Sequence, residues 1–203
     1  MIDRVSEHYR TLLKQHGDSA ESAQYSSRES QECRFSQLIK IGQLEGSKIL
    51  DFGCGTAHFA TYLKSLNINV QYTGADTVEE FFSVAKKKHP QHRFGLYEEF
   101  SKERFDYVFI SGVFNNKRRD NRNFYQNWIR ELFSLCDRGL AFNMMSTYVD
   151  YKDKNLFYEK PERAFSFVKS EITPFVTLRH DYEVKQDVIP FEFVIFAYRD
   201  AVI

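Results

Sequence analysis

Two carboxylates and two glycines carry the clearest chemical signal in this sequence. Residues 48–59 read KILDFGCGTAHF, so a short apolar run ends at Asp51, and Gly53 and Gly55 follow it one residue apart. Glycine allows a sharp backbone turn and a close approach to a ligand, because it has no side chain. Asp76 lies 21 residues after Gly55, close to the spacing at which an acidic side chain accepts hydrogen bonds from a ribose diol. The pattern predicts a nucleoside-binding site.

A strand, a tight turn and a helix are needed to position the glycines. The apolar run before Asp51 predicts the strand, and the helical spacing of the apolar residues from Phe59 to Leu66 predicts the helix. The third glycine of the dinucleotide fingerprint is replaced by His58, where close packing of helix on strand leaves no room for a side chain. The sequence therefore disfavours NAD.

The order of residues from Asp51 to Ala57 is acidic residue, any residue, Gly, Cys, Gly, Thr and a small residue. This order resembles motif I of the class I S-adenosylmethionine-dependent methyltransferases. The resemblance implies that S-adenosyl-L-methionine is the cofactor and that the segment after the fourth strand faces the transferred methyl group. The residues expected to bind the cofactor are Asp51, Gly53, Cys54, Gly55, Thr56, Asp76, Thr77, Glu98, Ser111, Gly112, Gln31 and Arg34.

The resemblance also implies the fold, an α/β, Rossmann-like, doubly wound and mostly parallel seven-stranded sheet with an antiparallel last strand and N-terminal lid helices. Residues 45–203 would form the methyltransferase domain, and residues 1–44 a helical lid packed on it. The pattern predicts helices over 1–16, 32–44, 124–139 and 161–172, later strands over 93–96, 105–110 and 140–145, and a closing antiparallel pair over 175–180 and 191–198.

Several boundaries depend on individual polar or small residues. Residues 18–30 are polar and predict a mobile connection, although Tyr25, Ser30, Gln31 and Arg34 are candidates to cover the cofactor; ordinary surface positions are an equal alternative for them. Thr77 with Glu80 predicts a capping box on the helix after the second strand. Gly139 would end the helix over 124–139 as a C-cap, and residues 146–159 would form the substrate loop.

Three residues are candidates for the methyl-acceptor site. If the acceptor is a hydroxyl, a histidine is suited to remove its proton, and His180 follows a predicted strand with a carboxylate next to it. Asn115 lies in the segment after the fourth strand, and Tyr148 lies in the predicted substrate loop. A histidine that merely binds a nearby loop is an equally good interpretation of His180.

Composition limits the partners of the protein. The 203 residues include 28 Lys and Arg and 28 Asp and Glu, so there is no net charge to attract nucleic acid or an anionic membrane. Its three cysteines are far apart and form no metal-ligand spacing, which suits a reducing cytoplasm and predicts no bound metal. Without a signal segment or an apolar run of about 18 residues, we expect a soluble, unprocessed, cytoplasmic protein without membrane partners.

The predicted activity is methyl transfer to a small molecule, first of all to a hydroxyl oxygen of a sugar, an acid or a natural-product intermediate. The layout is similar to that of small bacterial methyltransferases of glycan and secondary-metabolite pathways, which is an analogy at the level of fold. Alternatives are methylation of nitrogen in a small amine or a nucleic-acid base, and a non-catalytic binding module with this fold. Base methylation is disfavoured because Asn115-Asn116-Lys117 replaces the Pro-Pro-containing motif of those enzymes. The sequence does not indicate an oligomeric state.

Overall fold

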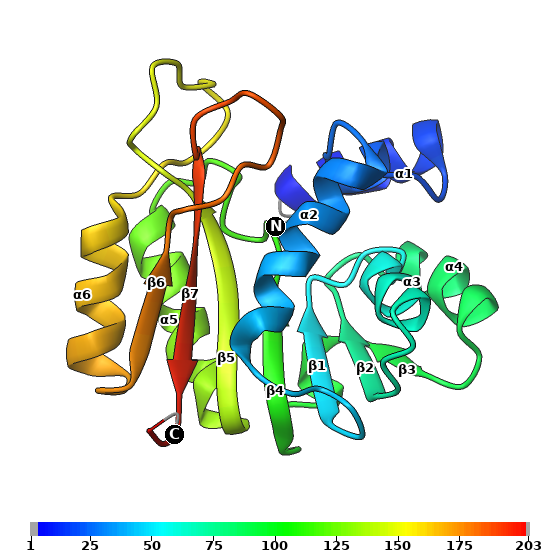
Figure 1. Ribbon diagram of the computed structural model, residues 1–203. Helices are drawn as coiled ribbons and strands as arrows, with labels where there is room; N and C mark the ends of the chain where they lie inside the picture. Colours follow the sequence, from blue (N-terminus) through cyan, green and yellow to red (C-terminus); the bar gives the residue numbers. More distant parts are fainter. Residues whose placement is uncertain (1–3, 202–203) are drawn as a thin grey trace.

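Seven strands form one sheet at the centre of the computed structural model, which describes residues 4–201 (Figure 1). In chain order they are β1 (Lys48–Phe52), β2 (Gln71–Ala75), β3 (Arg93–Gly95), β4 (Phe105–Ile110), β5 (Cys136–Met145), β6 (Val176–Arg179) and β7 (Glu192–Tyr198). The spatial order is β3-β2-β1-β4-β5-β7-β6. Strand β7 is antiparallel to β5 and to β6, and the other neighbours are parallel. The predicted doubly wound sheet and its antiparallel closing pair are confirmed.

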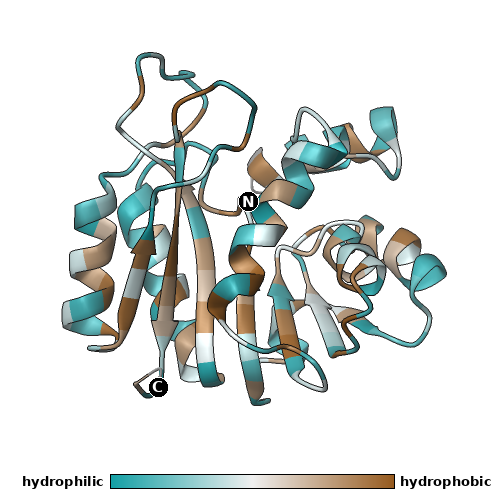
Figure 2. Ribbon diagram, in the orientation of Figure 1, coloured by the Kyte–Doolittle hydropathy of each residue, from teal (hydrophilic) through white to brown (hydrophobic). Residues whose placement is uncertain are grey.

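Helices cover both faces of the sheet, because successive residues of a central strand point to opposite sides. The helices are α1 (Arg4–His16), α2 (Arg28–Leu38), α3 (His58–Ser65), α4 (Glu80–Lys88), α5 (Asn121–Ser134) and α6 (Pro161–Glu171). In β1, Ile49 packs with apolar residues of α2, α3 and α4, whereas Leu50 packs with those of α5 and α6. Both side chains are fully buried, and the apolar colouring of the central strands in Figure 2 follows this arrangement.

The N-terminal segment contains more regular structure than the sequence predicts. Residues predicted as a connection include a short 3-10 turn, η1 (Glu21–Ala23), and the first turn of α2. Helix α2 begins at Arg28 rather than near residue 32, because the hydroxyl oxygen of Ser27 accepts a hydrogen bond from the backbone N–H of Ser30. The predicted start was therefore four residues too late.

Two predicted helix caps are wrong. Helix α4 begins at Glu80 without a side-chain cap, and the Thr77 hydroxyl instead lies 3.2 Å from the hydroxyl of Ser6 in α1. Gly139 lies within β5 rather than after α5. A Cβ atom at Gly139 would lie 2.8 Å from the carbonyl oxygen of Ala197 in β7, so glycine there permits close strand pairing.

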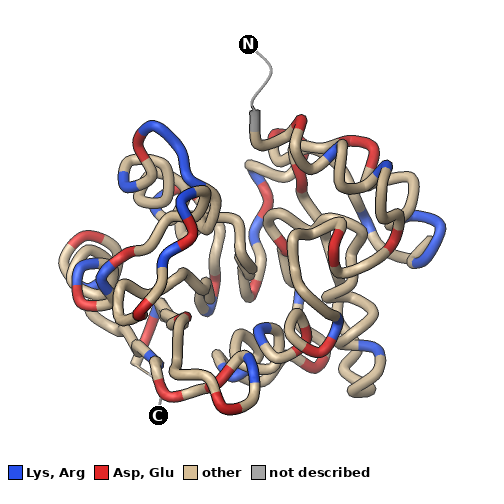
Figure 3. The backbone as a smooth tube through the Cα atoms, turned by 90° about the horizontal axis from the view of Figure 1, so that it is seen from above, with Lys and Arg blue, Asp and Glu red and all other residues tan. Residues whose placement is uncertain are grey.

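The carboxyl ends of β1, β2 and β4 meet at one edge of the sheet, beneath α1 and α2 (Figure 1). Open α/β sheets bind ligands at this edge. Viewed from above, acidic and basic residues are mixed around the described chain (Figure 3). None of the helices within residues 4–201 is long and apolar enough to span a membrane.

Candidate active site

The turn after β1 requires its glycines. Gly53 has φ +82° and Gly55 has φ +52°, which are left-handed conformations that favour glycine. The N–H groups of Gly53 and Cys54 both donate to the carbonyl oxygen of Ala75 in β2, at 2.7 and 3.1 Å. A Cβ atom at Gly53 would lie 2.3 Å from Cγ2 of Val113. Only a residue without a side chain leaves this corner open.

Asp76 connects the glycine corner to the end of β2. Its Oδ2 accepts the N–H of Gly55 at 2.9 Å, and its Oδ1 accepts the N–H groups of Thr77 at 2.7 Å and Val78 at 3.0 Å. These bonds fix the carboxylate and leave a lone pair on Oδ2 for a ligand hydroxyl. Burial raises the pKa of Asp76, although the three N–H groups oppose that rise.

Asp51 is the most deeply buried acidic residue of the corner, at 3% exposure. The Tyr72 hydroxyl of the neighbouring strand donates a hydrogen bond to its Oδ2. The pKa of Asp51 is raised to about 7, mainly by burial; the hydrogen bond from Tyr72 opposes this rise, and the nearby carboxylate of Asp76 adds to it. A buried carboxylate with this pKa favours a cationic group beside it.

A cavity of about 740 Å³ opens above the glycine corner, large enough for a sizeable ligand in the usual range of about 300–1,000 Å³. All of the residues predicted to bind the cofactor line it, and so does Asn115. We call the part beside the ends of β1, β2 and β3 the cofactor end. The part beside the ends of β4, β5 and β7, lined by Ser111, Asn115, Met145, Leu156 and Phe191, is called the acceptor end.

Buried polar side chains connect α2 to the acceptor end. The guanidinium of Arg34 donates from Nε to both carboxylate oxygens of Glu192, at 2.9 and 3.0 Å. Asn143 donates to the same carboxylate at 2.8 Å and accepts the N–H of Gly112 at 2.8 Å. Glu192 and Asn143 are fully buried, and Arg34 is 7% exposed. Through this network, α2 is linked to the turn that follows β4.

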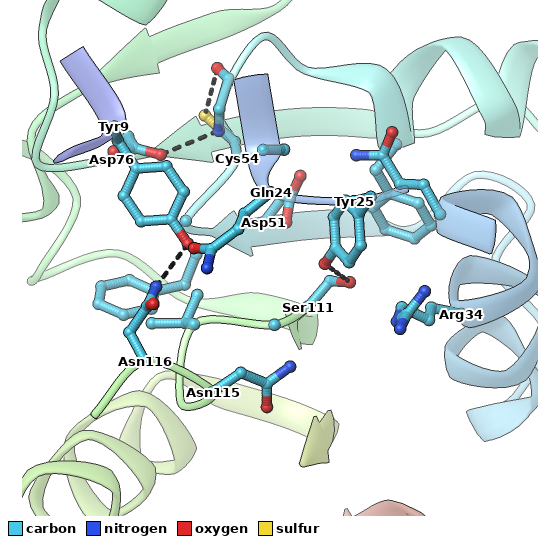
Figure 4. Close-up of a pocket in the computed structure, with 18 of the residues that line it drawn as sticks. Tyr9, Gln24, Tyr25, Arg34, Asp51, Cys54, Asp76, Ser111, Asn115 and Asn116 are labelled. Carbon is cyan, nitrogen blue, oxygen red and sulfur yellow. Dashed lines mark hydrogen bonds between the residues drawn. The ribbon is translucent and has the colours of Figure 1, made fainter. Parts of the chain in front are cut away.

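Tyr25 completes the connection on the cavity side (Figure 4). Its ring lies under the guanidinium of Arg34, 4.8 Å from ring centre to Cζ, and its hydroxyl is 3.2 Å from the hydroxyl of Ser111. A Cβ atom at Gly112 would lie 2.5 Å from the Tyr25 hydroxyl oxygen. The glycine, which has φ +73°, thus allows Tyr25 to reach the end of β4.

Helix α1 covers the cofactor end. Tyr9 lines the cavity and accepts a hydrogen bond from Nδ2 of Asn116 at 2.9 Å (Figure 4). Arg10 of the same helix donates to Glu80 at 3.0 Å. Together with the contact of α1 to Thr77, these bonds fasten α1 across the end of β2.

The structure does not bring His180 or Tyr148 to the cavity. Nε2 of His180 lies 3.0 Å from the carbonyl oxygen of Pro190, as in the alternative interpretation of a loop-binding histidine. The Tyr148 ring is 56% exposed, and its hydroxyl donates to Glu162. Neither side chain lines the cavity, so the structure lends no support to their predicted place at the acceptor end.

Sequence reasoning missed Tyr9, Asn143 and Glu192. Glu192 did carry a signal, because it is the only charged residue in the apolar run from Phe191 to Tyr198 and a buried charge needs a partner. Its partner, Arg34, is 158 positions away in the sequence. No local pattern identifies that pair.

A nucleoside with a cationic amino-acid group fits the cofactor end. The glycine corner leaves room for a ligand to lie against the protein backbone. Asp76 keeps a lone pair that can accept a ligand hydroxyl, and the buried carboxylate of Asp51 suits an ammonium group. These are the groups that S-adenosyl-L-methionine presents.

Comparisons with known proteins identify a domain family and a shared fold. A family model described as a methyltransferase domain matches residues 50–137, a range that contains the corner, Asp76 and the segment after β4. A search of curated proteins finds no match.

Many solved structures share the fold. Magnesium protoporphyrin IX methyltransferase from Synechocystis, with S-adenosylhomocysteine bound, has a TM-score of 0.63 at 14% identity, covering 98% of this chain and 89% of its own. The 1,6-didemethyltoxoflavin-N1-methyltransferase from Burkholderia thailandensis has 0.65 at 15%, covering 98% and 88%. A methyltransferase from Archaeoglobus fulgidus has 0.66 at 14%, covering 97% and 100%.

Proposed function

We propose that this chain is a class I S-adenosylmethionine-dependent methyltransferase and that it methylates a small molecule on a hydroxyl-type oxygen that ionises readily in neutral water. A carboxyl group and an acidic phenol are such acceptors. The observation that carries the proposal is the acceptor end itself, which combines polar and apolar side chains but offers no available base among its described residues.

Methyl transfer requires an electron-rich atom behind the methyl group. The cofactor supplies a methyl group already activated by a sulfonium, so the protein mainly has to position the acceptor, which can contribute about 7–11 kcal/mol. The Arg34–Glu192–Asn143 network keeps the Gly112 turn in one arrangement at the acceptor end. Tyr25 and Ser111 form the polar wall beside it.

The hydrogen bonding and protonation of the polar side chains at the acceptor end favour an acceptor that needs no base. The Glu192 carboxylate is held by Arg34 and Asn143, and burial raises the pKa of the Tyr25 hydroxyl, which keeps the hydroxyl protonated and unable to remove a proton from the acceptor. His180 lies outside the cavity. A neutral sugar hydroxyl would need its proton removed, so an oxygen that is already ionised is the better match.

Cationic side chains at the cavity support an anionic acceptor. Lys185 and Arg118 both line it, and the Arg118 guanidinium lies 4.0 Å from the centre of the Phe124 ring. Apolar side chains of Met145, Leu156 and Phe191 form the rest of the acceptor end. This combination suits an apolar or aromatic body with one negative group.

A nitrogen of a small amine is the second candidate, because an unprotonated amine also attacks without a base. The neighbour from Burkholderia thailandensis is named as an N1-methyltransferase and was crystallised with its small substrate. The two candidates differ in the charge that the acceptor carries when it enters the cavity. Lys185 and Arg118 would attract an anionic oxygen acceptor, and they would repel an amine in its protonated ammonium form.

Incubation with methyl-labelled cofactor and matched sets of aromatic carboxylic acids, phenols, amines and sugars tests the proposal. We expect methyl esters or methyl ethers of the acids or phenols, and a lower rate for Lys185→Ala. Methylation confined to amines or to neutral sugar hydroxyls would overturn it. Binding of S-adenosylhomocysteine serves as the control that each protein is intact at the cofactor end.

A further inference from the structure

His58 is a cavity residue to which none of the preceding steps gives a role. It is the first residue of α3 and follows directly on the glycine corner. Its side chain is 11% exposed and lines the cavity together with Gln31 of α2. A histidine at the position where nucleotide-binding corners place a glycine needs a reason for being kept there.

The imidazole of His58 is fixed from the side of α2. Its Nε2 lies 2.8 Å from Oε1 of Glu32, and its ring centre is 6.0 Å from that of Phe35. A carboxylate can only accept, so Nε2 carries the hydrogen. In the neutral ring, Nδ1 is therefore an acceptor.

The charged groups around His58 favour that neutral ring. Burial lowers its pKa, the nearby guanidinium of Arg28 lowers it further, and Lys88 acts in the same direction, whereas Glu32 opposes them. Arg28 is itself held by the carbonyl oxygen of Asp18, at 2.8 Å, and by Gln31, at 3.0 Å. A neutral imidazole acceptor suits a ligand group that donates N–H bonds.

We propose that His58 binds the amino-acid end of the cofactor by accepting a hydrogen bond from its ammonium group, and that Glu32 is the positioning residue that fixes the imidazole. This inference rests on the cofactor site described above. It adds a second partner for the ammonium group besides Asp51, which lines the same cavity. It also gives α2 a further, indirect part in binding, since Glu32 belongs to that helix and acts through His58.

Two ligands separate this role from a merely structural one. S-adenosylhomocysteine carries the amino-acid end, whereas 5′-methylthioadenosine has the same adenosine and sulfur without it. Calorimetry with His58→Ala should give roughly tenfold weaker binding of S-adenosylhomocysteine, the size expected when a hydrogen bond to a charged group is lost. The affinity for 5′-methylthioadenosine should stay within about twofold.

Variants of Glu32 test the positioning role without touching the ligand. Glu32→Gln keeps an oxygen that can accept the Nε2 hydrogen, so it should bind both ligands as the wild type does. Glu32→Ala should weaken the binding of S-adenosylhomocysteine and leave the affinity for 5′-methylthioadenosine unchanged. His89→Asn is the matched control, because His89 is also bonded through Nε2, to Thr61 of α3 at 2.9 Å, but lies outside the cavity.

Each outcome decides a different point. If His58→Ala weakens both ligands equally, or leaves the affinity for S-adenosylhomocysteine unchanged, the inference is wrong while the cofactor site stands. If the wild type binds neither ligand, the cofactor site itself is wrong. Equal losses in Glu32→Gln and Glu32→Ala would remove the positioning role alone.

Discussion

Replacing Asp51 with asparagine isolates the charge at the base of the cofactor end. The two side chains have the same shape, and the amide oxygen can still accept the hydrogen bond of the Tyr72 hydroxyl. The substitution therefore removes the ionisable group and keeps the packing. The substitution should raise the stability of the ligand-free protein and weaken the binding of the cofactor.

The effect on stability depends on pH. Burial raises the folded-state pKa of Asp51 from 3.8 to about 7, so the folded protein binds more protons at this site than the unfolded chain does. The stability of the wild type must then fall as pH rises from about 4 to about 7, and stay lower above that range. A rise of about three pKa units corresponds to roughly 4 kcal/mol.

Thermal unfolding without ligand at pH 5.0 and pH 8.5 measures this effect. The melting temperature of Asp51→Asn minus that of the wild type should be larger at pH 8.5 than at pH 5.0. The expected increase is up to roughly 10 °C for a chain of this size. Calorimetry at pH 8.5 should nevertheless show S-adenosylhomocysteine binding at least tenfold more weakly to Asp51→Asn, because the ammonium group loses its charged partner. A stability difference that does not change with pH would refute the reasoning.

Three other perturbations test the rest of the site. Glu192→Leu leaves Arg34 buried without its carboxylate and should lower the free energy of unfolding in urea by about 3–5 kcal/mol, with partial recovery in the double variant Arg34→Met, Glu192→Leu; an unchanged urea midpoint would contradict the buried pair. Gly112→Ala forces a side chain into a left-handed turn and against Tyr25, so it should weaken the binding of S-adenosylhomocysteine in calorimetry and lower the melting temperature; wild-type values for both would be inconsistent with the close approach. His180→Ala and Tyr148→Phe should keep turnover and cofactor affinity within about twofold of the wild type, and a large loss of turnover would put these rings back at the acceptor end.

The cofactor end could be predicted from the sequence because its signals are local. The glycines of the corner are required by the backbone, and Asp76 follows at a spacing set by one βαβ unit. Short segments of strand, turn and helix contain all of this information. The apolar runs likewise predicted individual strands, and the resemblance to a family supplied their arrangement in a doubly wound, mostly parallel sheet.

The acceptor end could not be predicted, because it is assembled from distant parts of the chain. The partner of Arg34 lies in the last strand, and Tyr25 contacts Ser111 across 86 positions. Local reasoning instead chose His180, whose position after a strand is right but whose ring binds the carbonyl oxygen of Pro190. A strand end determines where a side chain begins, whereas tertiary packing determines where it points.

The central claim is that Asp76 and the glycine corner bind the adenosyl cofactor, and calorimetry with S-adenosylhomocysteine tests it most directly. The control is Asp106→Ala, because Asp106 also accepts a backbone N–H, that of Lys48 at 2.8 Å, but at the opposite end of β1 from the corner. The wild type and Asp106→Ala should bind the ligand, and Asp76→Ala should bind it at least tenfold more weakly. No binding by the wild type, or equal affinity in Asp76→Ala, would contradict the claim.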